Sequence, residues 1–162
     1  GSGFFLDKCR FPGSHPRIGL MDLNPAAISY TAARISRYNP EKYLHNIFEP
    51  LDFHYPKFSS ISLNYLLHCL PGNLAEKSII FDHIQSLADP GAICFGSTLL
   101  GDGISLNWGA KHLMSFYNKK GIFSNSGDNA RNLEKELCKR LDIISFEIVG
   151  AAVLFSGHLN KK

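Results

Sequence analysis

The residues best suited to chemistry stand where short apolar segments end. Asp22 directly follows residues 18–21 (IGLM), whose pattern predicts a buried parallel strand. Asn24 and Pro25 then favour the start of a helix, as its N-cap and its first helical residue. Ligands bind at the carboxyl ends of parallel strands, and a carboxylate there can accept both hydroxyls of a ribose. Helix capping or simple exposure to water is an equally good interpretation of Asp22.

Two further predicted strands end in polar side chains. Residues 43–47 are expected to form a strand with Asn46 near its carboxyl end. Residues 60–67 (SISLNYLL) are expected to form another, which leads into the polar segment from Asn64 to His68. An amide such as Asn46 can hydrogen-bond an adenine edge, with Leu23 and Ile47 on the faces of the ring. These strand ends therefore predict a nucleoside site.

A glycine pair precedes the first predicted helix, Phe4 to Arg10. Gly1 and Gly3 allow the close backbone approach that phosphate- and nucleotide-binding loops need, and Gly3 precedes Asp22 by the usual interval of about 20 residues. A remnant of protein expression is an alternative source of a terminal Gly-Ser. The same spacing also fits a dinucleotide-binding fingerprint, so the spacing alone does not identify which nucleotide binds.

The remaining elements alternate between helix and strand. Helical spacing is expected over residues 24–38, 73–88, 106–117 and 128–141, and strands over residues 92–100, 143–149 and 151–156. Asp89-Pro90-Gly91 is predicted to be a tight turn, and Gly150 to join the last two strands as antiparallel neighbours. This order predicts an α/β layered domain with a mostly parallel sheet and one reversed edge strand.

Composition narrows the function classes. The 162 residues are 44% hydrophobic and 19% charged, which indicates one globular domain. A net charge of +3, scattered along the chain, does not favour nucleic-acid binding. The four cysteines form no CxxC pair, so neither a zinc site nor a redox motif is expected, and reduced thiols favour a cytoplasmic protein. No membrane span or signal peptide is predicted.

With these features the chain resembles the class I S-adenosylmethionine-dependent methyltransferases. The resemblance covers nearly the whole sequence and is carried by GSGFFLD, LMDLNP, HNIFEP, NYLLHCLPG and LADPGAICFGS. It implies a Rossmann-like, mostly parallel sheet with helices on both faces and an antiparallel terminal strand. It also implies an enzyme that binds S-adenosylmethionine and passes its methyl group in line to a small-molecule acceptor.

The resemblance also implies roles for individual residues. Gly1 and Gly3 would line the methionine part of the cofactor, and Asp22 would take the ribose hydroxyls. Asn64 and Tyr65 would lie near the methionine end and the substrate mouth. His68 would be the candidate general base, although a hydrogen bond to a neighbouring loop is the more common role for such a histidine. The complete expected cofactor set is Gly1, Gly3, Asp22, Leu23, Asn24, Asn46, Ile47, Asn64 and Tyr65.

One departure from the family concerns its central strand. The usual order is 3-2-1-4-5-7-6, and nothing in the sequence matches strand 1 or the first part of the glycine motif. Residues 1–162 are therefore expected to be a single methyltransferase-like domain that lacks its first strand, with more chain upstream of Gly1 in the native protein. The alternative is that the strands on either side close up and damage the cofactor pocket.

Two other functions are compatible with the sequence. An NAD-dependent oxidoreductase would share the glycine-to-acid spacing, but no Tyr-x-x-x-Lys pair follows the fourth strand of the family order. A non-catalytic interaction domain would keep the fold without the cofactor. For a methyltransferase, residues 101–125 would form part of the substrate site. A homodimer is compatible with the sequence.

Overall fold

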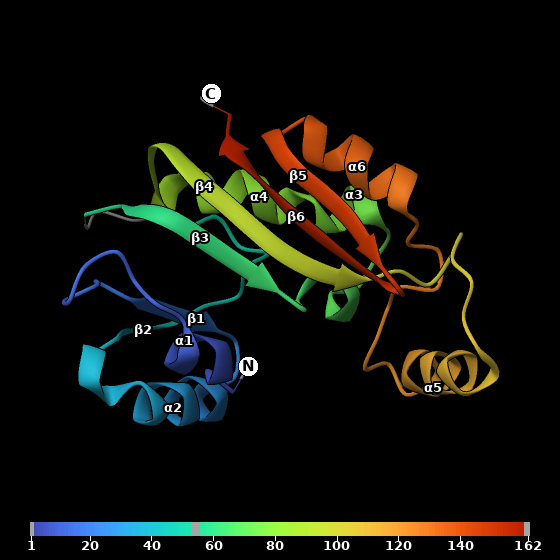
Figure 1. The fold of residues 1–162 in the computed structure, drawn as a ribbon, viewed down its shortest axis with the longest axis horizontal. Helices are drawn as coiled ribbons and strands as arrows, with labels where there is room; N and C mark the ends of the chain where they lie inside the picture. Colours follow the sequence, from blue (N-terminus) through green and yellow to red (C-terminus); the bar gives the residue numbers. More distant parts are fainter. Residues whose placement is uncertain (1, 53–55, 161–162) are drawn as a thin grey trace. The chain divides into compact units, whose positions relative to one another are not determined.

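A computed structural model describes residues 2–52 and 56–160. The chain forms two compact units, residues 1–50 and 51–162 (Figure 1). No helix within the described ranges is long and apolar enough to cross a membrane.

The first unit is a β-α-β arrangement preceded by a short helix. Strands β1 and β2 are parallel, and their register pairs Gly19 with Glu41 and Asp22 with Leu44. Ala32 of helix α2 and Ile35, its C-cap, are buried together with Leu20 of β1 and the preceding Ile18. The elements are α1 (Phe4–Lys8), β1 (Gly19–Asp22), α2 (Pro25–Arg34), the 3-10 helix η1 (Ser36–Tyr38) and β2 (Glu41–Leu44).

The start of α2 confirms the capping prediction. The Asn24 side chain accepts a hydrogen bond from the Ala26 N–H at 2.9 Å, and Pro25 occupies the first turn, where no N–H is needed. The predicted helical segment 24–38 is divided, because regular helix stops at Arg34 and continues as η1. Asn39 then ends η1 in the left-handed conformation, with φ of 47°.

The second unit contains a four-stranded sheet in the order β3-β4-β6-β5. β3 and β4 are parallel, and β6 is antiparallel to both β4 and β5. The predicted α/β class with a mostly parallel sheet is confirmed, but the reversed strand lies inside the sheet and not at its edge. The elements are β3 (Phe58–Asn64), η2 (Leu67–Cys69), α3 (Leu74–Lys77), α4 (Ile79–His83), η3 (Ile84–Leu87), β4 (Ala88–Leu99), α5 (Trp108–Lys119), α6 (Ala130–Cys138), β5 (Leu141–Val149) and β6 (Ala152–Leu159).

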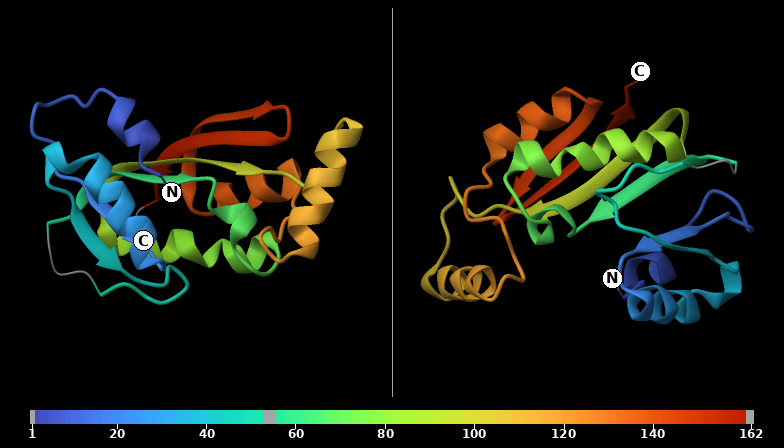
Figure 2. Two further views of the ribbon diagram at one scale, coloured as in Figure 1. Left: turned by 90° about the horizontal axis from the view of Figure 1, so that it is seen from below. Right: turned by 180° about the vertical axis from the view of Figure 1, so that it is seen from behind.

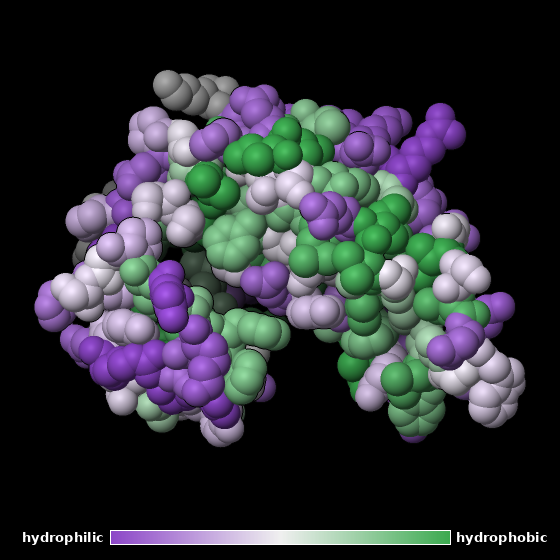
Figure 3. All heavy atoms as spheres, viewed as in Figure 1, coloured by the Kyte–Doolittle hydropathy of each residue, from purple (hydrophilic) through white to green (hydrophobic). Residues whose placement is uncertain are grey.

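Helices cover one face of this sheet. Phe81 of α4 meets Phe155 of β6 edge-to-face, with ring centroids 6.1 Å apart, and the view from behind shows the helices over the strands (Figure 2). On the opposite face Ile93, Phe95 and Leu154 are exposed, and hydrophobic side chains gather over these strands (Figure 3). Helices α3, α4 and α6 lie on this face, whereas α5 belongs to the connection that follows β4.

Two boundaries in the second unit differ from the sequence prediction. The predicted helix 73–88 is three consecutive pieces, α3, α4 and η3, although Ile80 and Ile84 are buried as expected. Asp89-Pro90-Gly91 does not separate two elements, because β4 already begins at Ala88. These residues form an irregularity inside β4, where the register jumps from the pair Phe58–Ala88 to the pair Ser60–Ile93.

Candidate functional site

In the first unit Asp22 lies where the sequence placed it, at the carboxyl end of a parallel strand. One carboxylate oxygen, Oδ1, accepts a hydrogen bond from the Asn24 N–H at 2.9 Å, and the Asp22 carbonyl accepts one from His45 at 3.2 Å. The first bond holds the carboxylate at the junction of β1 and α2, and the second, between backbone groups, joins the end of β1 to the residue after β2. Leu23, beside it, is 68% exposed and so presents an apolar surface at this junction.

Asn46 was predicted to lie near the end of a strand, but it lies outside one. β2 covers residues 41–44, so Asn46 lies two residues beyond it in a turn. Its Oδ1 accepts from the Phe48 N–H at 3.1 Å, and its Nδ2 donates to Glu49 at 3.3 Å. The prediction failed because an Asn after a strand can form such a local turn as readily as it can extend the strand. Ile47 is half-buried in the same turn.

Gly3 is the N-cap of α1, and its backbone is left-handed, with φ of 69°. A Cβ atom added there would lie 2.8 Å from Thr31 Cγ2 of α2, so a glycine allows α1 to approach α2. Gly1 lies outside the described residues.

In the second unit the carboxyl ends of β3 and β4 form a polar edge. Asn64, the last residue of β3, pairs with Ser97 of β4 and accepts its hydroxyl at 3.0 Å. Asn64 also donates to the Ser62 hydroxyl at 2.7 Å. Tyr65 follows with a φ of 53° and donates its N–H to the Ser97 carbonyl at 2.7 Å, while its side chain is half exposed. The predicted strand 60–67 therefore ends three residues early, at a sharp backbone bend.

His68 is buried beside this edge, with 3% of its surface exposed. Its Nδ1 lies 3.3 Å from the Thr98 hydroxyl and accepts the Leu99 N–H at 3.4 Å, which places the ring proton on Nε2. Phe123 meets the ring edge-to-face, with centroids 4.7 Å apart. Burial, together with the nearby Lys77 charge, lowers the pKa of His68 to about 4. The imidazole is therefore neutral near pH 7 and is a weak base.

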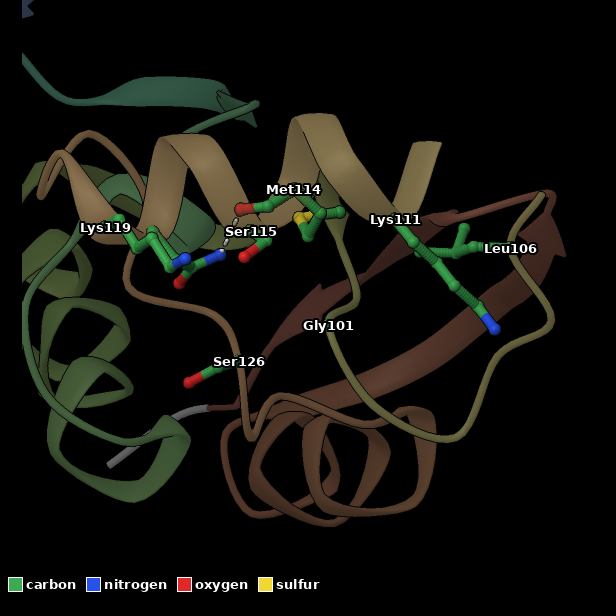
Figure 4. Close-up of a pocket in the computed structure, with 8 residues that line it drawn as sticks. Gly101, Leu106, Lys111, Met114, Ser115, Lys119 and Ser126 are labelled. Carbon is green, nitrogen blue, oxygen red and sulfur yellow. Dashed lines mark hydrogen bonds between the residues drawn. The ribbon is translucent and has the colours of Figure 1, made fainter. Parts of the chain in front are cut away.

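A pocket of about 430 Å³ opens beyond the end of β4, between α5 and the connections on either side of it (Figure 4). Asn118 and Asn125 hold these parts together: Asn118 Nδ2 donates to Asn125 Oδ1 at 2.9 Å, and Asn125 Nδ2 donates to the Leu99 carbonyl at 2.9 Å. Gly101 lines the pocket where the chain passes close to Asn125. A Cβ atom at Gly101 would lie only 2.0 Å from the Asn125 carbonyl oxygen.

A buried ion pair holds the connection between α5 and α6. Lys77 Nζ lies 2.7 Å from Asp128 Oδ2, both side chains are almost fully buried, and the same ammonium donates to the Ser124 carbonyl. Burial raises the pKa of the Asp128 carboxyl, and the Lys77 charge opposes that rise. The Asp128 carbonyl in turn accepts the N–H groups of Gly101 and Asp102 at 3.0 and 3.1 Å. The ion pair thus fixes both ends of the segment that carries α5.

Sequence reasoning missed Lys77 and Asn125 as structural determinants of this edge, and it named Tyr65 only as a cofactor contact. Lys77 left a signal, because it shares the helical spacing of the buried Ile80 and Ile84, where a lysine needs a partner. The left-handed Tyr65 left none, since tyrosine has no preference for positive φ.

Comparisons with known proteins find similar methyltransferases. The chain is 37% identical to demethylluteothin O-methyltransferase of Streptomyces thioluteus over 139 residues, 86% of this chain and 60% of that protein. It is 35% identical to methyltransferase aurB of Calcarisporium arbuscula over 174 residues, 98% of this chain and 74% of that protein. The chain therefore spans about three fifths to three quarters of these relatives. No protein-family model matches it.

Solved structures show the same fold. The N-methyltransferase NodS of Bradyrhizobium japonicum WM9, solved with S-adenosyl-L-homocysteine, superposes with a TM-score of 0.66 at 15% identity, over 99% of this chain and 74% of that one. Together with the sequence relatives, this likeness shows that the chain belongs to the class I S-adenosylmethionine-dependent methyltransferase family.

Proposed function

We propose that this protein transfers a methyl group from S-adenosylmethionine to a small-molecule acceptor. The observation that carries the proposal is the place of Asp22, which ends a parallel strand with one carboxylate oxygen held by the Asn24 N–H. An acidic side chain fixed at such an edge suits the two hydroxyls of a ribose. Relatives named as O-methyltransferases and as an N-methyltransferase support the reaction class.

The residues of the first unit fit the adenosine part of the cofactor. Asp22 would accept the ribose hydroxyls, and the exposed Leu23 would pack on the adenine ring. Asn24 would contribute indirectly. Its backbone N–H holds the Asp22 carboxylate, while its side chain caps α2. The turn that contains Asn46 and Ile47 would contact adenine, with the Asn46 amide already oriented by Phe48 and Glu49. Gly1 and Gly3 remain proposed contacts of the methionine part.

In the second unit Asn64 and Tyr65 would lie near the methionine end. The cofactor supplies an electrophilic methyl group on a sulfonium, and the protein must align the acceptor with it. His68 remains a proposed catalytic residue, but its burial and low pKa favour a positioning role. Because its Nδ1 accepts the Leu99 N–H and its ring packs edge-to-face against Phe123, it orders the end of β4.

The two strand orders support treating residues 1–162 as one methyltransferase-like domain. β2-β1 in the first unit and β3-β4-β6-β5 in the second match positions 3-2 and 4-5-7-6 of the family order. The strand that the family places at position 1 has no counterpart among the described residues 2–52 and 56–160. This interpretation stays a prediction.

Calorimetric titration with S-adenosylhomocysteine tests the proposal. Asp22→Asn keeps the oxygen that accepts the Asn24 N–H but removes the charge, so the fold should persist while affinity falls. Loss of a charge-assisted hydrogen bond predicts a decrease of ~10- to 100-fold. Asp142→Asn, at an exposed carboxylate on β5, is the matched control and should bind as the unaltered protein does.

Three outcomes would count against the proposal. Affinity of Asp22→Asn within about threefold of the unaltered protein would remove the ribose assignment. Binding of NAD in place of S-adenosylhomocysteine would favour the oxidoreductase alternative. Binding of neither nucleotide by the unaltered protein would favour the non-catalytic domain.

A further inference from the structure

The pocket beyond β4 has an uneven distribution of charge. Lys111 and Lys119 both line it, and none of its eight lining residues is acidic. Figure 4 shows the two lysines at opposite ends of the pocket, with Lys111 extending beside Leu106. The whole segment 103–127 contains three lysines and no Asp or Glu. The pocket therefore presents two ammonium groups with no carboxylate in its wall.

The nearest acidic residues along the chain have other partners. Asp128 is bound to the buried Lys77 at 2.7 Å, and Asp102 accepts a hydrogen bond from Asn129 at 3.4 Å. In the part of the chain that the structure describes, neither Lys111 nor Lys119 has an ion pair or a side-chain hydrogen bond. The positive potential of the pocket is therefore available to a ligand.

The remaining lining residues define the rest of that ligand. Leu106 and Met114 offer an apolar surface, and Ser115 and Ser126 offer hydroxyl groups on either side. A volume of about 430 Å³ suits a small organic molecule. A cationic amine would be repelled by both lysines, whereas an anion would be attracted.

We propose that this pocket binds the methyl acceptor and that the acceptor is an apolar molecule with an anionic group, such as a carboxylate or an acidic hydroxyl. The identification of the ligand as the acceptor rests on the proposed methyltransferase function. The pocket begins two residues after β4, at the edge of the sheet where ligands of parallel strands bind. The anionic specificity rests on Lys111 and Lys119 alone.

Two matched probes test the charge preference: 2-naphthoate, and 2-naphthamide, which has nearly the same shape without the charge. Amide NMR shifts of the protein are followed during titration with each probe. 2-Naphthoate should bind more tightly and shift resonances of residues 101–126. Lys111→Gln and Lys119→Gln should each weaken its binding by ~5- to 10-fold and leave 2-naphthamide binding unchanged.

Lys120→Gln is the control, because Lys120 lies over the Phe116 ring and outside the pocket. It should bind both probes as the unaltered protein does. Equal binding of the two probes, shifts confined to residues outside 101–126, or an effect of Lys120→Gln as large as that of the pocket lysines would each overturn the proposal.

The two proposals fail separately. Lys111→Gln and Lys119→Gln should keep the affinity for S-adenosylhomocysteine within about twofold, because neither lysine belongs to the proposed cofactor set. If the unaltered protein does not bind S-adenosylhomocysteine, the proposed methyltransferase function is wrong, and so is the assignment of the ligand as the methyl acceptor. Loss of 2-naphthoate selectivity would remove the anionic pocket and leave the methyltransferase proposal intact.

Discussion

At the scale of single residues, Tyr65 has the least expected backbone. It adopts a φ of 53° directly after β3, where a β-carbon is unfavourable, and its N–H is held by the Ser97 carbonyl at 2.7 Å. Such conformations persist only where the surroundings impose them, and they concentrate at functional sites. The bend turns the chain away from the sheet at the edge proposed to bind the cofactor.

Replacing Tyr65 with Asn or Ala separates backbone strain from the aromatic ring. Both variants remove the ring, which lies 5.9 Å from that of His68, but Asn tolerates the left-handed region better than Ala. We expect the Asn variant to be more stable than the Ala variant by ~0.5–1 kcal/mol in urea unfolding. Equal stabilities would show that the bend stores no strain.

His68 predicts a dependence of stability on pH. Its pKa is about 4 in the folded protein, against 6.5 ordinarily, so between these values the unfolded chain binds a proton that the folded protein does not. Its contribution is fully present above pH 6.5 and is lost as the pH falls toward 4. Between pH 7.5 and 4.5, the free energy of unfolding should fall by about 2–3 kcal/mol more in the unaltered protein than in His68→Asn. Parallel profiles in urea titrations would contradict this account.

At the scale of elements, the segment that carries α5 is held at both ends by buried polar contacts. Helix α5 itself contributes no fully buried side chain among its described residues. Its position therefore depends on Asn118, Asn125 and the pair of Lys77 with Asp128. Satisfied buried polar groups of this kind fix one arrangement, and a missing partner is costly.

Removing one member of the buried ion pair should cost more than removing both. Lys77→Met leaves the Asp128 carboxylate buried without its partner, and we expect a loss of ~3–5 kcal/mol. The double variant Lys77→Met/Asp128→Leu should recover part of that loss, because no unpaired charge remains. Thermal and urea unfolding measure both values, and additive losses would show that the two groups do not interact.

Two glycines of the same region make a matched test of packing. Gly101→Ala forces a Cβ atom against the Asn125 carbonyl, so we expect destabilisation by roughly 2 kcal/mol or more. Gly109→Ala, inside α5, meets no atom closer than 3.6 Å and should stabilise the protein by ~0.5–1 kcal/mol. Unfolding of the two variants by urea gives the comparison. A neutral Gly101→Ala would mean that the loop can move away from Asn125.

Elements whose signals are local were predictable from the sequence. Asn24 and Pro25 gave the start of α2, and Gly150 gave the tight antiparallel join, with φ of 62°. Asp89-Pro90-Gly91 misled because the residues of a turn also suit an irregularity within a strand. Asn46 misled in the same way, since its side chain closes a turn after β2. In both cases the residues do have the expected preference for a turn. Strand pairing elsewhere in the fold decided whether that turn lies inside a strand or after it.

At the scale of the whole molecule, strand order could not be read from periodicity. The sequence predicted a reversed strand, but only pairing across the sheet places β6 between β4 and β5. The resemblance to a family supplied what local patterns lacked, because its order already sets the last strand inside the sheet. Site residues followed the same rule: Asp22 was found from its strand, whereas the lysines of the pocket became visible only once α5 was placed beside Gly101.

The central claim is that the proposed cofactor residues of this chain bind S-adenosylmethionine. Hydrogen–deuterium exchange with and without S-adenosylhomocysteine tests it most directly. We predict slower exchange on binding in three segments, residues 19–24, 44–48 and 64–68, and no change in β5. Protection confined to other segments, or no protection at residues 19–24 despite binding, would contradict the claim.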